Sequence, residues 1–214
     1  MNTAVVYAGE NDFKWSSYKS KDASWWSGSE ATGIADEIVQ YQLSDGGWRK
    51  DMKTESSGSW GKSTIDNNAT WGQIRFLAKV YNATKTEKYK DSCLKGIDLL
   101  ISGQYDNGGW PQVFGDPGTY HAHITYNDNA MVEVLNILQE IAKQSGDFAF
   151  VDSARQSKAK TAVDKGIQCI LNTQITSGGV KTAWGSSTMK RRCCRHPREP
   201  TRYRRSARRR ASAS

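Results

Sequence analysis

One pattern, a glutamine followed a few residues later by two glycines, occurs three times in this chain. It lies at residues 42–48, at 104–110 (62 residues later) and at 174–180 (a further 70 residues later). A second pattern repeats at an offset of 61, because Thr-Ile-Asp-Asn-Asn-Ala at 64–69 resembles Thr-Tyr-Asn-Asp-Asn-Ala at 125–130. A repeat of this length predicts one supersecondary unit that is used several times.

The content of each unit is helical. Apolar residues recur every three or four positions, which predicts amphipathic helices. The predicted buried faces are Ile34, Ile38 and Tyr41; Ile74, Leu77, Ala78 and Tyr81; Leu94, Ile97, Leu100 and Ile101; Met131, Val134, Leu135, Leu138 and Ile141; and Ala162, Ile167, Ile170 and Leu171. We expect the paired glycines to end helices, where positive φ is needed, and Asp/Asn pairs to begin them by capping. Strands should be limited to short loop segments.

Helical hairpins that repeat at this interval predict an all-α fold, namely an α/α toroid or an incomplete turn of one. Such a fold buries one helix face and gathers its loops at one end. We therefore expect the repeated loops to converge on one site. A toroid left open would expose helix faces, which predicts low stability or aggregation.

The positive charge is concentrated at one end of the chain. The formal net charge is +8, yet residues 190–214 contain ten Arg, one Lys and a single acid, whereas residues 1–189 contain 19 basic and 21 acidic residues. We expect a disordered Arg-rich tail at 187–214, because it has too little apolar surface to offset its ordering entropy. It could be a basic arm for nucleic acid; the abrupt change in composition favours a frameshifted end, so nucleic acid is not the expected partner.

The length of the chain without its tail predicts one domain with one core. No apolar run approaches the roughly 20 residues of a membrane span. The first residues show no basic flank typical of a signal peptide. Cys93 and Cys169 lie singly in helical patterns, which predicts buried, inert thiols. Cys193 and Cys194 adjoin in the tail without other ligands at metal-binding spacing.

Two clusters combine acids and amides, at Asp66-Asn67-Asn68 and at Asn127-Asp128-Asn129. Helix N-capping would explain one such residue per helix start. It does not easily explain three consecutive oxygen-bearing side chains in both places. Carboxylate and amide oxygens are ligands that Ca²⁺ prefers, so the clusters also predict a shared metal or substrate site.

Aromatic and basic residues accompany these loops. Trp48 and Trp110 follow the glycine pairs and could either anchor the loops in the core or form platforms for sugar rings. Other tryptophans stand in polar surroundings: Trp25, Trp26, Trp60, Trp71 and Trp184. Arg49, Lys50 and Lys62 could be solvated or could pair with the carboxylates of an acidic sugar polymer. His121 and His123 lack a third nitrogen or sulfur ligand at useful spacing.

Several motifs together resemble pectate lyases of polysaccharide lyase family 10, from about Ser24 to Gly185. They are Tyr41-Gln42 with Gly46-Gly47-Trp48; Ser63-Thr64-Ile65-Asp66-Asn67 with Ala69-Thr70; Lys95-Gly96; Gln104-Tyr105 with Asn107-Gly108-Gly109-Trp110-Pro111-Gln112; and Ile124-Thr125-Tyr126-Asn127-Asp128-Asn129-Ala130-Met131. At the first loop, Trp48-Arg49-Lys50-Asp51 replaces the Trp-Pro-Lys-Asn expected for the family, so that Lys50 keeps its place.

The resemblance implies an α/α toroid, secretion, and Ca²⁺-dependent β-elimination on polygalacturonate (pectin). It also implies that the lyase-like domain spans 24–186, preceded by an N-terminal extension at 1–23. It places Asp66 and Asp128 at the catalytic centre. It implies metal ligation by Asp66, Asn67 and Asp128, and substrate binding by Lys50 and Asn127. Trp48 and Trp110 are the other predicted substrate-binding residues, because of their place in the glycine loops. We expect a monomer.

The family's catalytic arginine lies C-terminal to the matched stretch, and no tail arginine has a family-like context. We therefore expect impaired cleavage. The main alternative is a non-catalytic pectin-binding module. A cyclase-type toroid, suggested by the Gln-x-x-x-Gly-x-Trp pattern at 104–110, lacks a matching Asp-rich motif with an apolar cavity.

Overall fold

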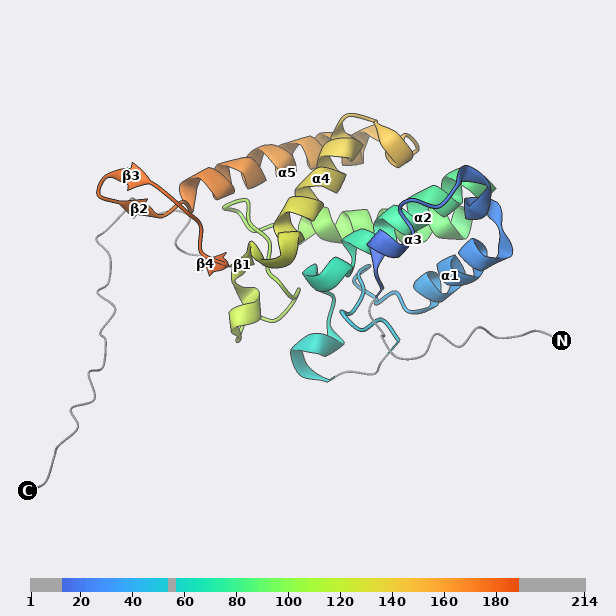
Figure 1. The fold of residues 1–214 in the computed structure, drawn as a ribbon, viewed down its shortest axis with the longest axis horizontal. Coiled ribbons are helices and arrows are strands. Elements are labelled where there is room, and N and C mark those ends of the chain that lie inside the picture. Colours follow the sequence, from blue (N-terminus) through green and yellow to red (C-terminus); the bar gives the residue numbers. More distant parts are fainter. Residues whose placement is uncertain (1–12, 54–56, 189–214) are drawn as a thin grey trace, which may run out of the picture.

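The computed structural model describes residues 13–53 and 57–188, and these are mainly helical (Figure 1). The α-helices are α1 (Ser29–Gln40), α2 (Trp71–Thr84), α3 (Glu87–Ser102), α4 (Ala130–Ala142) and α5 (Ser153–Asn172). Short 3-10 helices are η1 (Trp15–Ser17), η2 (Ala23–Ser27), η3 (Gly58–Gly61), η4 (Asp66–Asn68), η5 (Tyr120–Ala122), η6 (Asn127–Asn129) and η7 (Gly146–Phe148). The strands are two-residue pieces, β1 (Ile124–Thr125), β2 (Thr176–Ser177), β3 (Val180–Lys181) and β4 (Ser187–Thr188).

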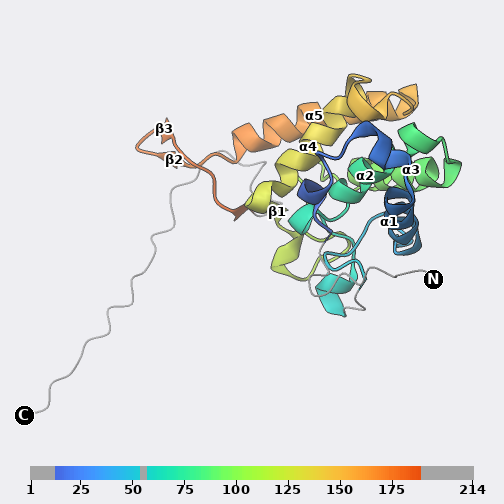
Figure 2. The ribbon, with the colours of Figure 1, turned by 45° about the vertical axis from the view of Figure 1, so that its right-hand side comes forward.

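The helices form two hairpins, α2–α3 and α4–α5, which lie side by side with α2 against α4 and α3 against α5. Helix α1 packs against α2 and α3, so α1 and α5 lie on opposite sides of the molecule (Figures 1 and 2). This is the helical-hairpin arrangement of an α/α toroid, which confirms the predicted fold class.

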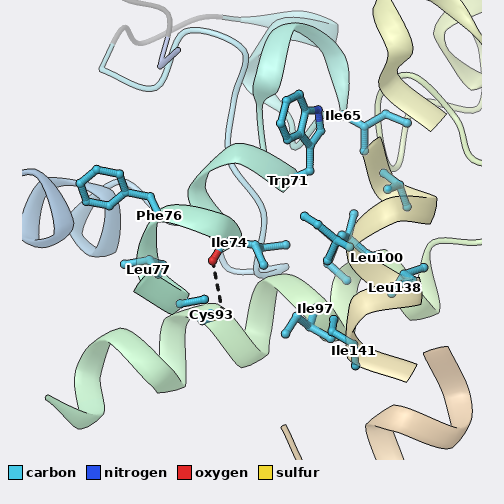
Figure 3. Packing of buried hydrophobic residues seen from close by; sticks show 14 of the residues in the cluster. Ile65, Trp71, Ile74, Phe76, Leu77, Cys93, Ile97, Leu100, Leu138 and Ile141 are labelled. Carbon is cyan, nitrogen blue, oxygen red and sulfur yellow. Dashed lines mark hydrogen bonds between the residues drawn. The ribbon is translucent and has the colours of Figure 1, made fainter. Parts of the chain in front are cut away.

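The core lies where the two hairpins meet. Figure 3 shows Ile74 and Leu77 of α2, Ile97 and Leu100 of α3, and Leu138 and Ile141 of α4 around this contact. The spacing of three or four residues places these side chains on one face of each helix, where burial of apolar surface stabilises the fold.

Two thiols belong to this core. Cys93 donates to the carbonyl of Ile74 at 3.5 Å, and burial raises the pKa of its thiol. Cys93 and Cys169 are both buried thiols that form no disulfide, which confirms their predicted burial; Cys193 and Cys194 lie outside the described residues.

The glycine pairs do not end helices as predicted. Helix α1 ends at Gln40, well before Gly46, which closes a tight turn in which the amide of Leu43 donates to the carbonyl of Gly47 (2.9 Å). Gly46 has φ +96° and Gly108 has φ +90°. A β-carbon at either position would meet the backbone oxygen of Lys95 (2.5 Å) or Lys165 (2.1 Å) respectively. The glycines therefore permit both a left-handed backbone and a close approach to the next repeat.

The third copy of the loop is displaced from the sequence alignment. The amide of Tyr105 donates to the carbonyl of Gly109 (2.8 Å), and in the third copy the amide of Ile175 donates to that of Ala183 (2.7 Å). The equivalent of the glycine pair is therefore Thr182-Ala183. Gly178 and Gly179 instead turn an inserted β2–β3 hairpin.

The predicted face of the last helix is wrong in two positions. Ala162 and Cys169 of α5 are buried, but Ile167 and Leu171 are exposed. In the second repeat, Ile97 occupies the place of Ile167 and is buried, because α4 and α5 follow it in the chain. Exposed large apolar residues in the described part gather mainly near this end, at Ile167, Leu171, Ile175, Val180 and Trp184.

The predicted domain boundaries fall inside packed structure. Phe13 is buried and contacts Tyr18 and Phe76, so residues 13–23 pack on the body rather than forming a separate extension. Residues 187–188 form β4, which pairs with β1. The rest of the predicted Arg-rich tail, 189–214, lies outside the described residues. Across 13–53 and 57–188, none of the helices has the length and apolar character needed to cross a membrane.

Candidate functional site

The two acid-amide clusters form equivalent turns with an unusual backbone. In η4, Asn67 and Asn68 have φ values of +45° and +70°; in η6, Asp128 and Asn129 have values of +50° and +59°. Asn and Asp tolerate this left-handed region better than most residues, which explains why both turns use them. Backbone in sparsely populated conformations is often found at functional sites.

Equivalent hydrogen bonds fix both turns. The carbonyl of Trp48 accepts from the amide of Thr64 (3.1 Å), and that of Trp110 accepts from Thr125 (3.3 Å). Each threonine hydroxyl then accepts from the amide two residues later, Asp66 (3.1 Å) or Asn127 (3.3 Å). The turn geometry therefore belongs to the repeat itself.

Helix capping does not account for these clusters. The N-cap residues of α2 and α4 are Thr70 and Asn129, and neither makes a side-chain capping bond. The N-cap positions therefore use no side-chain oxygen of the two turns to cap a helix. This weakens the interpretation of the clusters as helix caps.

The first turn holds a buried carboxylate beside a lysine. Asp66 is 4% exposed, and its Oδ2 lies 3.0 Å from Nζ of Lys50. The Lys50 side chain is 31% exposed, so a solvent-borne ligand can reach it. The structure thus brings together two of the predicted site residues, the carboxylate of Asp66 and the ammonium of Lys50.

The second turn is open. Asn127, Asp128 and Asn129 are exposed, and Nδ2 of Asn127 donates to Oδ2 of Asp128 at 2.8 Å. They line an open hollow of about 680 Å³ together with Tyr126 and the segment 182–186. A second hollow, between α3 and the start of α5, is lined by Arg155, which is paired with Asp98 and Asp152, and no acid-amide turn lines it.

The two turns lie on the same side of the helices. Turn η4 packs against α4, the helix that η6 precedes directly. The chain segments that follow the two glycine loops also pair, since the amide of Ile65 donates to the carbonyl of Gln112 at 3.1 Å. The predicted convergence of the loops is thus observed for these segments.

The tryptophans predicted as sugar platforms are buried instead. Trp48 and Trp110 are both 0% exposed. Their Nε1 atoms donate to the carbonyls of Ile38 and Leu100, each at 2.7 Å. A sugar cannot reach either ring, so both serve as core anchors and the substrate-binding prediction is wrong for them.

The third anchor is Trp184, whose Nε1 donates to the carbonyl of Ile170 at 2.7 Å. It is 43% exposed and lines the hollow with Asp128. The inserted hairpin concealed this role in the sequence, although the polar surroundings of Trp184 were a usable signal.

Trp60 is a second aromatic residue that the loop pattern did not single out. Nζ of Lys50 lies 4.8 Å from the centroid of its ring. The ring also makes an edge contact with His121, with 4.8 Å between centroids. His121 is buried and its Nδ1 lies 3.0 Å from Oε1 of Gln112, so within the described residues it fills a structural place.

The donor set suits Ca²⁺ in kind, because both turns supply oxygen ligands. Within the described residues, no three His, Cys, Asp or Glu side chains gather into a metal cluster. Amide oxygens, water or substrate would therefore have to complete the coordination of an ion at Asp66, Asn67 or Asp128. At Asp66 the ion would also have to displace the ammonium of Lys50.

Comparison with known proteins supports the resemblance found in the sequence. A family model described as pectic acid lyase matches residues 39–193. No curated protein matches the chain.

Two solved structures of a family 10 polysaccharide lyase from Cellvibrio cellulosa are similar. One, a point mutant in complex with trigalacturonic acid, has 32% identity and a TM-score of 0.69, over 79% of this chain and 55% of its own. The other has 31% identity and a TM-score of 0.68, over 86% of this chain and 59% of its own. The chain thus spans between half and two thirds of the length of these relatives. It belongs to the pectic acid lyase family, among the family 10 polysaccharide lyases.

Proposed function

We propose that this protein binds polygalacturonate in a Ca²⁺-dependent manner at its two acid-amide turns, with weak or no β-elimination by the described part alone. The observation that carries the proposal is the turn at Asp66, where the N-cap residue of α2 makes no side-chain capping bond. There Nζ of the partly exposed Lys50 lies 3.0 Å from Oδ2 of Asp66. A related lyase was solved with trigalacturonic acid, which supports an acidic galacturonate as the ligand.

Each residue has a distinct role in this proposal. Lys50 binds a uronate carboxylate, since a charged donor on a carboxylate makes a strong hydrogen bond. Asp66, Asn67 and Asp128 hold Ca²⁺, and Asn127 orients the substrate beside Asp128. When bound, the ion withdraws electrons from the uronate carboxylate, which makes the proton on the neighbouring carbon more acidic.

The described arginines do not supply the base that would remove this proton. Nε of Arg49 donates to the carbonyl of Gly61, and Arg75 makes two bonds to Glu140 (3.0 and 2.8 Å). Arg155 pairs with Asp98 and Asp152, and these hydrogen bonds raise the pKa of its guanidinium. Each of the three arginines is engaged by a structural partner, which supports impaired elimination.

The test separates binding from cleavage. The purified full chain is run through gels containing polygalacturonate, with Ca²⁺ or with a chelator, and the same protein is assayed for the ultraviolet absorbance of unsaturated product. We expect calcium-dependent retardation and little product. Equal mobility with and without Ca²⁺ would contradict the proposed binding, and rapid calcium-dependent product formation would contradict the impaired cleavage.

The second candidate, a pectin-binding module without any catalysis, gives retardation and no product at all. The engagement of the three described arginines favours it. The proposal also includes a secreted monomer, which fractionation of the natural source and light scattering of the pure chain would test.

A further inference from the structure

The ammonium of Lys50 is held from two sides. One is the carboxylate of Asp66 at 3.0 Å, and the other is the ring of Trp60 at 4.8 Å. A lysine over an indole gains a cation–π attraction, for which Trp is the most effective ring. Because a lysine side chain is long and flexible, two contacts restrict it far more than one.

The segment that carries Trp60 is fastened to the next repeat by one carboxylate. Oδ2 of Asp116 accepts from the hydroxyls of Ser59 and Thr119, each at 2.6 Å. Its Oδ1 accepts from Nζ of Lys62 at 2.8 Å. These three donors, with Lys62 the strongest, hold the pKa of Asp116 well below its usual range.

Two further hydrogen bonds hold the same segment in place. Nζ of Lys62 also donates to the carbonyl of Gly115 (2.8 Å), and Nε of Arg49 donates to that of Gly61 (3.1 Å). The Trp60 ring also makes an edge contact with the ring of the buried His121. The indole thus has a fixed place from which it can hold Lys50.

We propose that Trp60 is a positioning residue that keeps the Lys50 ammonium at the first turn when Asp66 takes another cation, and that Asp116 fixes Trp60 in place. A cation at Asp66 removes the first of the two contacts of Lys50. The indole contact remains, so the ammonium stays where a uronate carboxylate arrives. This inference rests on the proposed function. It adds Trp60, which lies outside the two turns, to the residues on which binding of the polymer depends.

The first experiment follows the position of Lys50 directly. Lysine is labelled with ¹³C, and the methylene signals of Lys50 are assigned through their loss in Lys50→Met. An indole above the side chain shifts these signals upfield. We expect the shift to vanish in Trp60→Ala, to persist in Trp60→Phe, and to shrink in Asp116→Asn; a shift unchanged in Trp60→Ala overturns the proposal.

The second experiment measures trigalacturonate binding by calorimetry in Ca²⁺. We expect Trp60→Ala to lower the affinity about fivefold to tenfold, with Trp60→Phe close to the native protein. In a Lys50→Met background, Trp60→Ala should have no further effect, because the two residues act as one unit. An equal loss in both backgrounds would mean that Trp60 touches the sugar itself and would overturn the positioning role.

Trp25→Ala is the matched control, since Trp25 is also partly exposed but belongs to the separate cluster with Tyr18 and Phe76. It should leave trigalacturonate binding unchanged, and thermal melting of each variant verifies folding. If the native protein binds no trigalacturonate, the proposed function fails, while the labelled lysine signals still decide the position of Lys50.

Discussion

The turns at 66–68 and 127–129 share a backbone but differ in their surroundings. Both contain residues with left-handed backbone conformation, and both are held by a threonine and a tryptophan at equivalent positions of the repeat. The acid of the first turn is buried against Lys50, whereas the acid of the second is exposed beside an open hollow. The two acids stand at different positions of the turn, since Asp66 corresponds to Asn127 and Asp128 corresponds to Asn67. In addition, Lys50 follows Trp48 by two positions, whereas Gln112 and Ser186 hold that place after Trp110 and Trp184. The repeat therefore sets the backbone, whereas the position of the acid within each turn and the presence of Lys50 set the charge.

The largest effect should come from the glycine loop that supports the second turn. Gly108→Ala would place a β-carbon 2.1 Å from the backbone oxygen of Lys165, at a φ of +90°. We expect the free energy of unfolding in urea to fall by about 3 kcal/mol or more. Gly178→Ala is the control, since a β-carbon there meets nothing within 4 Å at a φ of +57°, and should cost about 1 kcal/mol. Equal costs at both positions would mean that the close approach is not a constraint.

Removing each acid tests whether the turns differ energetically. Asp66→Ala leaves the ammonium of Lys50 without its carboxylate, and we expect a loss of about 1–3 kcal/mol, reduced because Lys50 is partly in water. Asp128→Ala should change unfolding by less than about 0.5 kcal/mol, as for an exposed residue. Both variants should bind Ca²⁺ and polygalacturonate at least tenfold more weakly. Similar stability of the two variants would remove the distinction drawn between the turns.

Neutralising the lysine should make the first turn resemble the second. In Lys50→Met, a cation no longer competes with an ammonium for Asp66, so Ca²⁺ affinity measured by calorimetry should rise about threefold to tenfold. Lys79→Met removes the same charge from a residue of similar exposure that pairs with Asp147, and it should leave the affinity nearly unchanged. A fall in Ca²⁺ affinity in Lys50→Met would show that the lysine supports the ion rather than competing with it.

The smallest effect concerns acid. The folded pKa of Asp116 is lowered by Lys62, Ser59 and Thr119, so the carboxylate contributes stability above its unfolded pKa of about 3.9. This contribution is lost as the pH falls below about 4 toward the folded pKa. We therefore expect Asp116→Asn to flatten the loss of thermal stability in this acid window and to leave its shape near neutral pH unchanged. An unaltered acid profile would mean that Asp116 contributes nothing to it.

Much of this molecule could be predicted from the sequence. The 3–4 periodicity identified the helices, and the repeat identified both acid-amide turns, because these features depend on local residues. The sequence did not decide between burial and exposure of Trp48 and Trp110, since their burial depends on Gly96 and Gly166 of the following repeats, whose hydrogens leave room for the indoles.

Other errors have the same origin in the position of a residue within the repeat. The exposure of Ile167 follows from its place in the last described hairpin, although its sequence resembles that of the buried Ile97. The role of Trp184 was concealed by an insertion of four residues, which the alignment of Gly178 and Gly179 could not reveal. Lys50 and its partner Asp66 were both predicted, but the contact of Lys50 with the ring of Trp60 was not.

Trp184 has a consequence for how ligand entry can be observed. Its indole is tied to the carbonyl of Ile170 while part of the ring remains in water beside Asp128. The emission of such a ring depends on what occupies the hollow, whereas the rings of Trp48 and Trp110 are shielded from it. The third copy of the anchor therefore provides the protein with an intrinsic fluorescent reporter for its open turn.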